Sequence, residues 1–167
     1  MERKDIVIGI VIVAILALVI YWLRRPETPQ ITVLPSPTPS IEQSIESVFN
    51  VDIPEGLEKA ELKPVGDVIG TALATRVFEN SKFTFSVLAD LPDPINGEYY
   101  NVWISQGAPD DQSVKLTSLG KMRVAKGGWM LEYQSNTNYP DYNSVVVTQE
   151  SVSDSKPETR ILGGSFQ

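Results

Sequence analysis

An uncharged apolar segment of 18 residues, Ile6–Leu23, restricts the fold of this chain more than any other feature of its sequence. In a helix with a rise of about 1.5 Å per residue, the segment would be ~27 Å long, close to the ~30 Å hydrocarbon core of a bilayer. Tyr21 and Trp22 lie near its end, and amphipathic aromatic side chains favour the lipid–water interface. We therefore predict one transmembrane helix at residues 6–23, as in a single-pass membrane protein.

A cleavable signal peptide is the alternative, because Arg3 and Lys4 supply a positively charged N-terminal region. The apolar segment, however, exceeds the roughly 7–15 residues usual in a signal peptide, and no A-x-A-like cleavage site follows it. These two features favour an uncleaved anchor, with residues 1–5 as a short tail. Arg24 and Arg25 balance the two basic residues before the segment, so the positive-inside rule alone leaves the orientation open.

The charged residues are distributed unevenly along the chain. The whole sequence has 14 basic and 21 acidic residues, a net charge of −7. Without the four basic and two acidic residues that flank the apolar segment, residues 26–167 hold 10 basic and 19 acidic residues, a net charge of −9. Such a surface repels nucleic acids and anionic membrane surfaces, so we expect no nucleic-acid partner.

The sequence contains no cysteine and no histidine. This composition excludes disulfides, a thiol nucleophile and thiolate zinc sites, and it removes the commonest general base and the commonest transition-metal ligand. We therefore expect a protein that is not an enzyme and that needs no cofactor.

Residues 24–40 form a predicted linker, because five prolines alternate with Ser and Thr between positions 26 and 40. Such a composition favours an extended, polyproline-like spacer that holds a domain away from the bilayer. A proline-motif ligand is the alternative. A short helix is predicted at residues 41–49, where Ser40 and Gln43 form a capping-box pattern ahead of an apolar stripe.

From residue 57 onward, apolar residues recur with a period of two, which is typical of half-buried strands. The pattern is clearest at residues 82–91, where the apolar residues of one face alternate with Thr84 and Ser86: Phe83, Phe85, Val87 and Ala89. Further strands are indicated at residues 59–63, 72–79, 99–105, 114–124 (interrupted by Gly120), 129–134, 144–150 and 160–162. We predict a mainly β domain over residues 41–167, an immunoglobulin-like antiparallel β-sandwich of about seven strands.

Several short motifs in the C-terminal two-thirds occur in a characteristic order. They are Leu91-Pro92, the segment Gly97–Ile104 (GEYYNVWI), Leu119-Gly120, the segment Val145–Glu150 (VVVTQE) and Pro157-Glu158. In this order and spacing, residues 75–166 resemble the C-terminal domain of the anti-sigma-K factors. The resemblance implies a membrane-anchored bacterial regulator whose C-terminal domain is a β-sandwich outside the cytoplasm, and this would resolve the orientation of the anchor.

The sequence also departs from that family. A complete anti-sigma factor has a cytoplasmic helical domain that binds the sigma factor, whereas only Met1–Asp5 precede the predicted span here. We therefore expect the extracytoplasmic half of the family without its sigma-binding domain.

Aromatic residues are the first candidates for a binding surface. Trp103 and Trp129 could each support a stacked ligand, but packing in the core or against a sheet is the favoured interpretation. Four tyrosines could add a surface for a glycan or a peptide: Tyr99, Tyr133, Tyr139 and Tyr142. We interpret them instead as strand residues and as side chains that plug loops.

Several acidic residues could supply oxygen ligands to Ca²⁺: Asp90, Asp93, Asp110, Asp111, Asp141, Glu150 and Asp154. None of them shows the spacing of a calcium loop, so we interpret them as solvated carboxylates in turns. Ser165 follows two glycines without the G-x-S-x-G frame of a nucleophile elbow, and Gly127-Gly128 lacks the residues of a phosphate loop. We predict no catalytic, cofactor-binding or metal-binding residue.

Three functions are compatible with these patterns. The first is a binding or sensing module, anchored in the membrane and facing outward, that regulates an envelope or membrane partner. The second is a structural or adhesive component of the cell surface. The third is an anti-sigma regulator that acts with a separately encoded cytoplasmic domain.

Overall fold

A computed structural model describes residues 19–21, 38–95, 97–107 and 114–167. The chain divides into two units, residues 1–37 and 38–167. Val19–Tyr21 is helical, while the rest of the predicted span at residues 6–23, the tail at residues 1–5 and residues 24–37 of the predicted linker lie outside the described residues. Within the described ranges, no helix is both long and apolar enough to cross a membrane.

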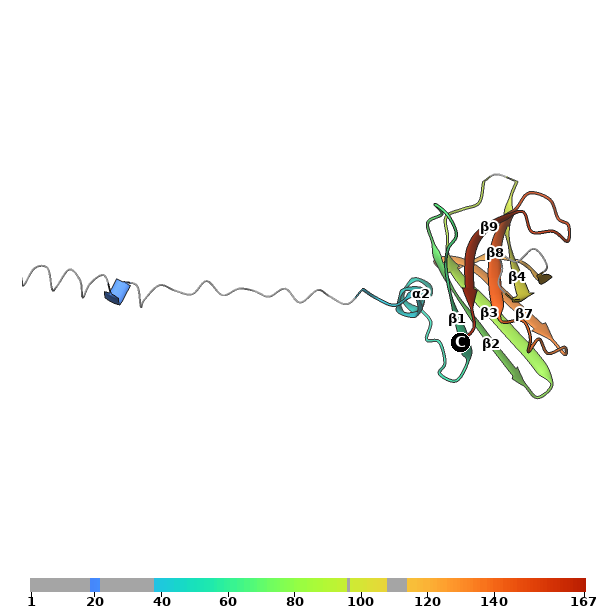
Figure 1. The fold of residues 1–167 in the computed structure, drawn as a ribbon, viewed down its shortest axis with the longest axis horizontal. Coiled ribbons are helices and arrows are strands. Elements are labelled where there is room, and N and C mark those ends of the chain that lie inside the picture. Colours follow the sequence, from blue (N-terminus) through green and yellow to red (C-terminus); the bar gives the residue numbers. More distant parts are fainter. Residues whose placement is uncertain (1–18, 22–37, 96, 108–113) are drawn as a thin grey trace, which may run out of the picture. The chain divides into compact units, whose positions relative to one another are not determined.

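Nine antiparallel strands form one hydrogen-bonded sheet in the second unit, in the order β5-β4-β8-β9-β1-β2-β3-β7-β6 (Figure 1). The strands are β1 (Glu58–Pro64), β2 (Thr71–Glu79), β3 (Lys82–Asp90), β4 (Tyr99–Gln106), β5 (Lys115–Lys121), β6 (Arg123–Ala125), β7 (Gly128–Ser135), β8 (Ser144–Glu150) and β9 (Thr159–Ser165). The prediction of a mainly β, antiparallel domain is confirmed. The strands number nine instead of about seven, and they belong to one continuous sheet.

The sheet curls because two segments take part in both of its halves. In β1, residues 58–62 pair with β2, whereas Lys63 and Pro64 pair with β9. On the other side, β5 pairs with β4 and β6 pairs with β7, and only Met122 separates β5 from β6. The first and last strands of the sheet order are therefore consecutive in the chain, so the ends of the sheet meet at Met122.

The break at Met122 differs from the sequence prediction of one strand at residues 114–124 interrupted at Gly120. Gly120 has a positive φ of 126° but remains within β5. Met122 is buried, and its N–H donates to the carbonyl of Tyr100 at 2.9 Å. The strand therefore changes partners where the apolar side chain of Met122 enters the core.

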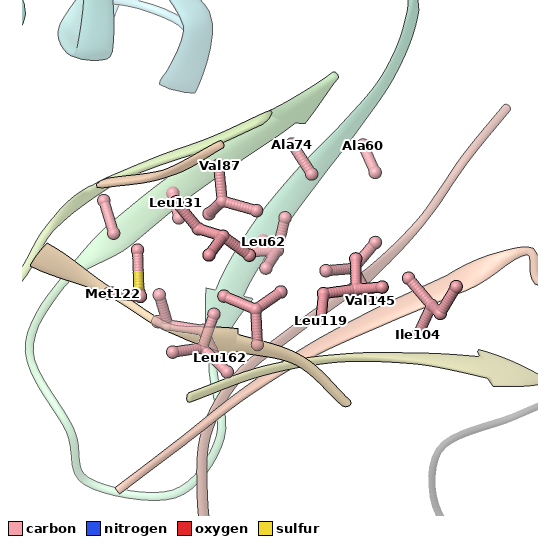
Figure 2. Close-up of a cluster of buried hydrophobic side chains, with 14 of the residues drawn as sticks. Ala60, Leu62, Ala74, Val87, Ile104, Leu119, Met122, Leu131, Val145 and Leu162 are labelled. Carbon is pink, nitrogen blue, oxygen red and sulfur yellow. The ribbon is translucent and has the colours of Figure 1, made fainter. Parts of the chain in front are cut away.

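The core lies between the two halves of the curled sheet. Figure 2 shows side chains such as Leu62, Val87 and Leu131 pointing from one half toward Ile104 and Val145 of the other. The predicted alternation in β3 is confirmed, because its odd-numbered residues from 83 to 89 are all at most 2% exposed. Each large apolar side chain that is fully buried contributes roughly 1.5–3 kcal/mol to stability.

Helix α2 (Ile41–Phe49) covers the outer surface of the sheet at β2 and β3. Its capping box is confirmed: the N–H of Gln43 donates to Ser40 Oγ at 3.2 Å, and the Gln43 side chain accepts from the N–H of Ser40 at 3.1 Å. Ile45 and Phe49 pack on Leu73 and form a second, smaller apolar cluster. The helix therefore shields one outer patch of the sheet from solvent.

Candidate functional site

The turn between β2 and β3 marks one end of the curled sheet, and an open cavity of about 420 Å³ lies there. We call it the hairpin-end cavity. It is lined by Gly56, Glu58, Arg76, Val77, Phe78, Glu79, Phe83, Asn138, Tyr139 and Pro140. The lining comes from three segments of the chain: the start of β1, the β2–β3 hairpin and the loop 136–143 between β7 and β8.

Phe78 is the most unusual residue of this cavity. On β2, Ala72, Ala74, Arg76 and Phe78 share the face that packs on the core, because side chains alternate along a strand and the first two are fully buried. Phe78 is nevertheless 43% exposed, although its partner across the hairpin, Phe83, is only 2% exposed. A ring on the core-facing side of a strand is thus left open to the cavity.

The hairpin holds Phe78 in a fixed position. Asn80 and Ser81 have φ values of 50° and 61°, and two consecutive positive φ values characterise the type I′ turn of tight hairpins. The two strands remain in register up to the pair Glu79 and Lys82. The cavity wall is therefore regular sheet on this side.

The opposite wall is an aromatic plug from the loop 136–143. The ring of Tyr139 lies 5.1 Å from that of Phe83 and 5.4 Å from that of Tyr142, both edge to face. The hydroxyls of Tyr139 and Tyr133 are 3.1 Å apart, and this hydrogen bond, with burial, raises the pKa of Tyr139. The interpretation of Tyr139 and Tyr142 as loop plugs is confirmed.

Arg76 and Glu58 neutralise each other at the cavity. Arg76 Nε and Nη2 lie 2.7 and 2.6 Å from Glu58 Oε2. Nη1 donates to the carbonyl of Tyr142, and the guanidinium carbon lies 4.1 Å from the centroid of the Phe166 ring. The arginine is therefore fully engaged within the domain. Glu58 Oε1, in contrast, receives no hydrogen bond from any described residue, and the Glu58 side chain is 58% exposed.

Trp103 and Trp129, the two candidates for an aromatic platform, pack against other residues of the domain, as the favoured interpretation predicts. Trp103 is 3% exposed on the outer face of β4, and its Nε1–H donates to Thr148 Oγ1 at 2.8 Å. Trp129 is partly buried, with its ring 5.3 Å from that of Tyr100 and perpendicular to it. Tyr99 lies outside the cavity, and its hydroxyl donates to the carbonyl of Val152.

The acidic candidates do not come together. In the described part of the chain, no group of three Asp or Glu side chains could hold a metal ion, and Asp110 and Asp111 lie outside that part. Glu150 is buried in β8, where it accepts hydrogen bonds from the Thr148 hydroxyl and from the N–H of Glu158. It is a structural carboxylate and not a turn residue.

The remaining candidates are structural as well. Ser165 lies in strand β9, and its hydroxyl is 3.0 Å from that of Ser144. Gly127-Gly128 belongs to the β6–β7 hairpin beneath helix α2, where no space is left for a Cβ atom. Neither segment has the geometry of a nucleophile elbow or a phosphate loop.

The cavity residues Phe78, Arg76 and Glu58 were not among the sequence-based candidates. One signal for them exists: a charged residue that continues the even-numbered apolar face of β2, after Ala72 and Ala74, indicates an inward-facing arginine that needs a partner. No family model, no curated protein and no solved structure matches the chain.

Proposed function

We propose that this protein is a non-catalytic binding module, held by a membrane anchor outside the cytoplasm, and that the hairpin-end cavity is its ligand site. One observation carries the proposal: the half-exposed ring of Phe78 on the core-facing side of β2. Ala72 and Ala74 on the same face of β2 are buried, whereas Phe78 is not, and a ligand that covered the Phe78 ring would remove its apolar surface from water. The cavity combines apolar side chains with fixed polar groups, and small-ligand sites have both.

The resemblance to the outer domain of the anti-sigma-K factors is part of the same proposal. In this interpretation the two halves of the curled sheet correspond to the two layers of an immunoglobulin-like sandwich, and ligand binding regulates an envelope or membrane partner. The order of motifs in residues 75–166 and the apolar segment at residues 6–23 support this assignment.

A fluorescent reporter beside the cavity tests whether it binds ligands. Because the chain has no cysteine, Thr137→Cys gives a single attachment site on the loop that lines the cavity. The labelled full chain, in detergent micelles, is titrated with two pools: neutral oligosaccharides, and capped tripeptides of mixed side chains. We expect at least one pool to change the emission, and Phe78→Leu to abolish that change. If neither pool changes the emission at millimolar concentration, the cavity is not a ligand site.

A further inference from the structure

We infer that the ligand of the hairpin-end cavity is a neutral carbohydrate, with one sugar ring stacked on Phe78 and its hydroxyls bound by Glu58 and Asn138. This inference rests on the proposed function and specifies the chemistry of the same site.

The charge of the cavity argues against an anionic ligand. Arg76 is the only cation in the lining among the described residues, and it is paired with Glu58, with the Tyr142 carbonyl and with the Phe166 ring. An anionic ligand would have to displace these partners. Glu79 is opposite Lys82 in the hairpin, and both alternate with the core-facing residues, so this pair belongs to the outer face of the sheet. Glu79 nevertheless borders the cavity, so the lining holds two carboxylates and one paired cation, and this balance disfavours an anionic ligand.

Two residues of the lining keep polar atoms that are available to a ligand, one an acceptor and the other a donor. Glu58 Oε1 accepts from no described residue. Asn138 uses its side-chain oxygen to accept from the N–H of Tyr139 at 2.9 Å, which leaves its amide NH₂ directed away from that bond with no described acceptor. A hydroxyl group both donates and accepts, so a diol matches a carboxylate oxygen and an amide NH₂ together.

The aromatic face completes the match to a sugar. The C–H bonds on one face of a pyranose ring point in one direction, and they pack on the electron-rich face of an aromatic ring. Phe78, 43% exposed, is the aromatic residue of the lining that is most open to a ligand, and Tyr139 and Pro140 add apolar surface. The result is a platform with hydrogen-bonding groups at its edge.

A peptide backbone is the less favourable occupant. Peptides that add to a sheet need a strand edge with unpaired N–H and C=O groups. At the cavity, β2 is paired with β3 throughout, but its pairing with β1 ends at Arg76, so only Val77, Phe78 and Glu79 have an unpaired edge on that side. An edge of three residues is short for an added strand, since strands usually have about 5–6 residues, so side chains are the main binding groups of this wall.

The experiment asks two separate questions: whether the cavity binds a ligand, and whether that ligand is a carbohydrate. Full-length protein with ¹³C-labelled Phe and Tyr rings is titrated, in detergent micelles, with five neutral hexasaccharides built from glucose (α- and β-linked), N-acetylglucosamine, mannose and xylose. Two capped tripeptides, Gly-Phe-Gly and Gly-Lys-Gly, are titrated in parallel. We expect at least one oligosaccharide to shift the ring signals of Phe78 and Tyr139, and both peptides to bind at least about tenfold more weakly.

Variants identify the binding groups. Phe78→Leu should weaken oligosaccharide binding about tenfold or more, and Asn138→Ala and Glu58→Gln each by several-fold. Asn138 lies in an exposed loop, so its variant remains informative even where a change at Phe78 affects folding. Ile69→Ala, at an 84% exposed residue of the β1–β2 loop, is the matched control and should leave binding unchanged.

Two outcomes overturn the inference, and they differ in meaning. If the peptides bind through Phe78 while all five oligosaccharides fail, the cavity is a ligand site for another class and only the inference is wrong. If no probe shifts the rings of the cavity, the proposed function fails with it.

Discussion

At the scale of single residues, a buried chain of hydrogen bonds links β4, β8 and the end of the loop 151–158. Trp103 Nε1 donates to Thr148 Oγ1, whose hydroxyl donates to Glu150, and Glu150 also accepts from the N–H of Glu158 at 3.2 Å. Thr148 and Glu150 are at most 2% exposed. Every member is satisfied within the described structure, so removal of one group leaves another without a partner.

Thr148→Val removes the central hydroxyl of this chain while it keeps the shape of the side chain. The buried Trp103 N–H loses its acceptor and Glu150 loses a donor, so we expect a loss of about 1–3 kcal/mol in the free energy of unfolding, measured by urea titration. The control is Thr84→Val, because no described residue bonds to the Thr84 hydroxyl. Equal stability of both variants would contradict a structural role for the chain.

Glu158 makes the loop 151–158 sensitive to acid. Hydrogen bonds from the N–H and hydroxyl of Ser151 and from the N–H of Val152 lower the pKa of Glu158. The charged form is the one that binds these donors, so its stabilising effect is complete above the ordinary pKa of about 4.3 and is lost as the pH falls through the lowered value.

The amide proton shifts of Ser151 and Val152 report this titration by NMR. We expect both to change with a midpoint below the ordinary glutamate range, and Glu158→Gln to remove that change. A midpoint at or above the ordinary glutamate value of about 4.3 would show that the hydrogen bonds do not persist in solution.

At the scale of elements, the helix and the outer hairpin fit without spare volume. A Cβ at Gly127, where φ is +85°, would lie 2.3 Å from the carbonyl oxygen of Val48 in α2. A Cβ at Gly66, where φ is +75°, would have no heavy atom within 4 Å. The two glycines thus have the same backbone strain and differ in the space around them.

Substitution of each glycine by alanine distinguishes the cost of backbone strain from the cost of a steric clash with α2. Gly66→Ala should cost only the strain of a left-handed residue, roughly 1–2 kcal/mol. Gly127→Ala should cost about 1–3 kcal/mol more, because the added methyl pushes against α2. Urea unfolding measures both, and equal losses would mean that α2 does not rest on this hairpin.

The helices and strands also show how much of the fold could be predicted from the sequence. Local patterns sufficed for the capping box at Ser40 and for the alternation in β3, because these signals lie within a few residues. The division at Met122 depends on where pairing with β4 ends and pairing with β7 begins. The exposure of Phe78 depends on which distant segments cover the end of its hairpin. No period of the sequence encodes such long-range closure, so the cavity could not be predicted.

At the scale of the whole molecule, the charge and the anchor make a joint prediction. The sequence indicates a span at residues 6–23, a tail at residues 1–5 and, in residues 26–167, a net charge of −9. An acidic domain on the outer side would be repelled by anionic lipid headgroups, and a proline-rich linker would hold it at a distance.

Single cysteines determine this topology, because the chain has none of its own. Asp67→Cys, in the exposed β1–β2 loop, should react with a membrane-impermeant maleimide on intact cells or spheroplasts. Glu2→Cys, in the predicted tail, should react only after the membrane is permeabilised. Both variants should remain in the membrane fraction after carbonate extraction, since ~18 apolar residues suffice to span a bilayer. Labelling of Glu2→Cys alone on intact cells would reverse the orientation, and it would place the hairpin-end cavity where no envelope carbohydrate could reach it.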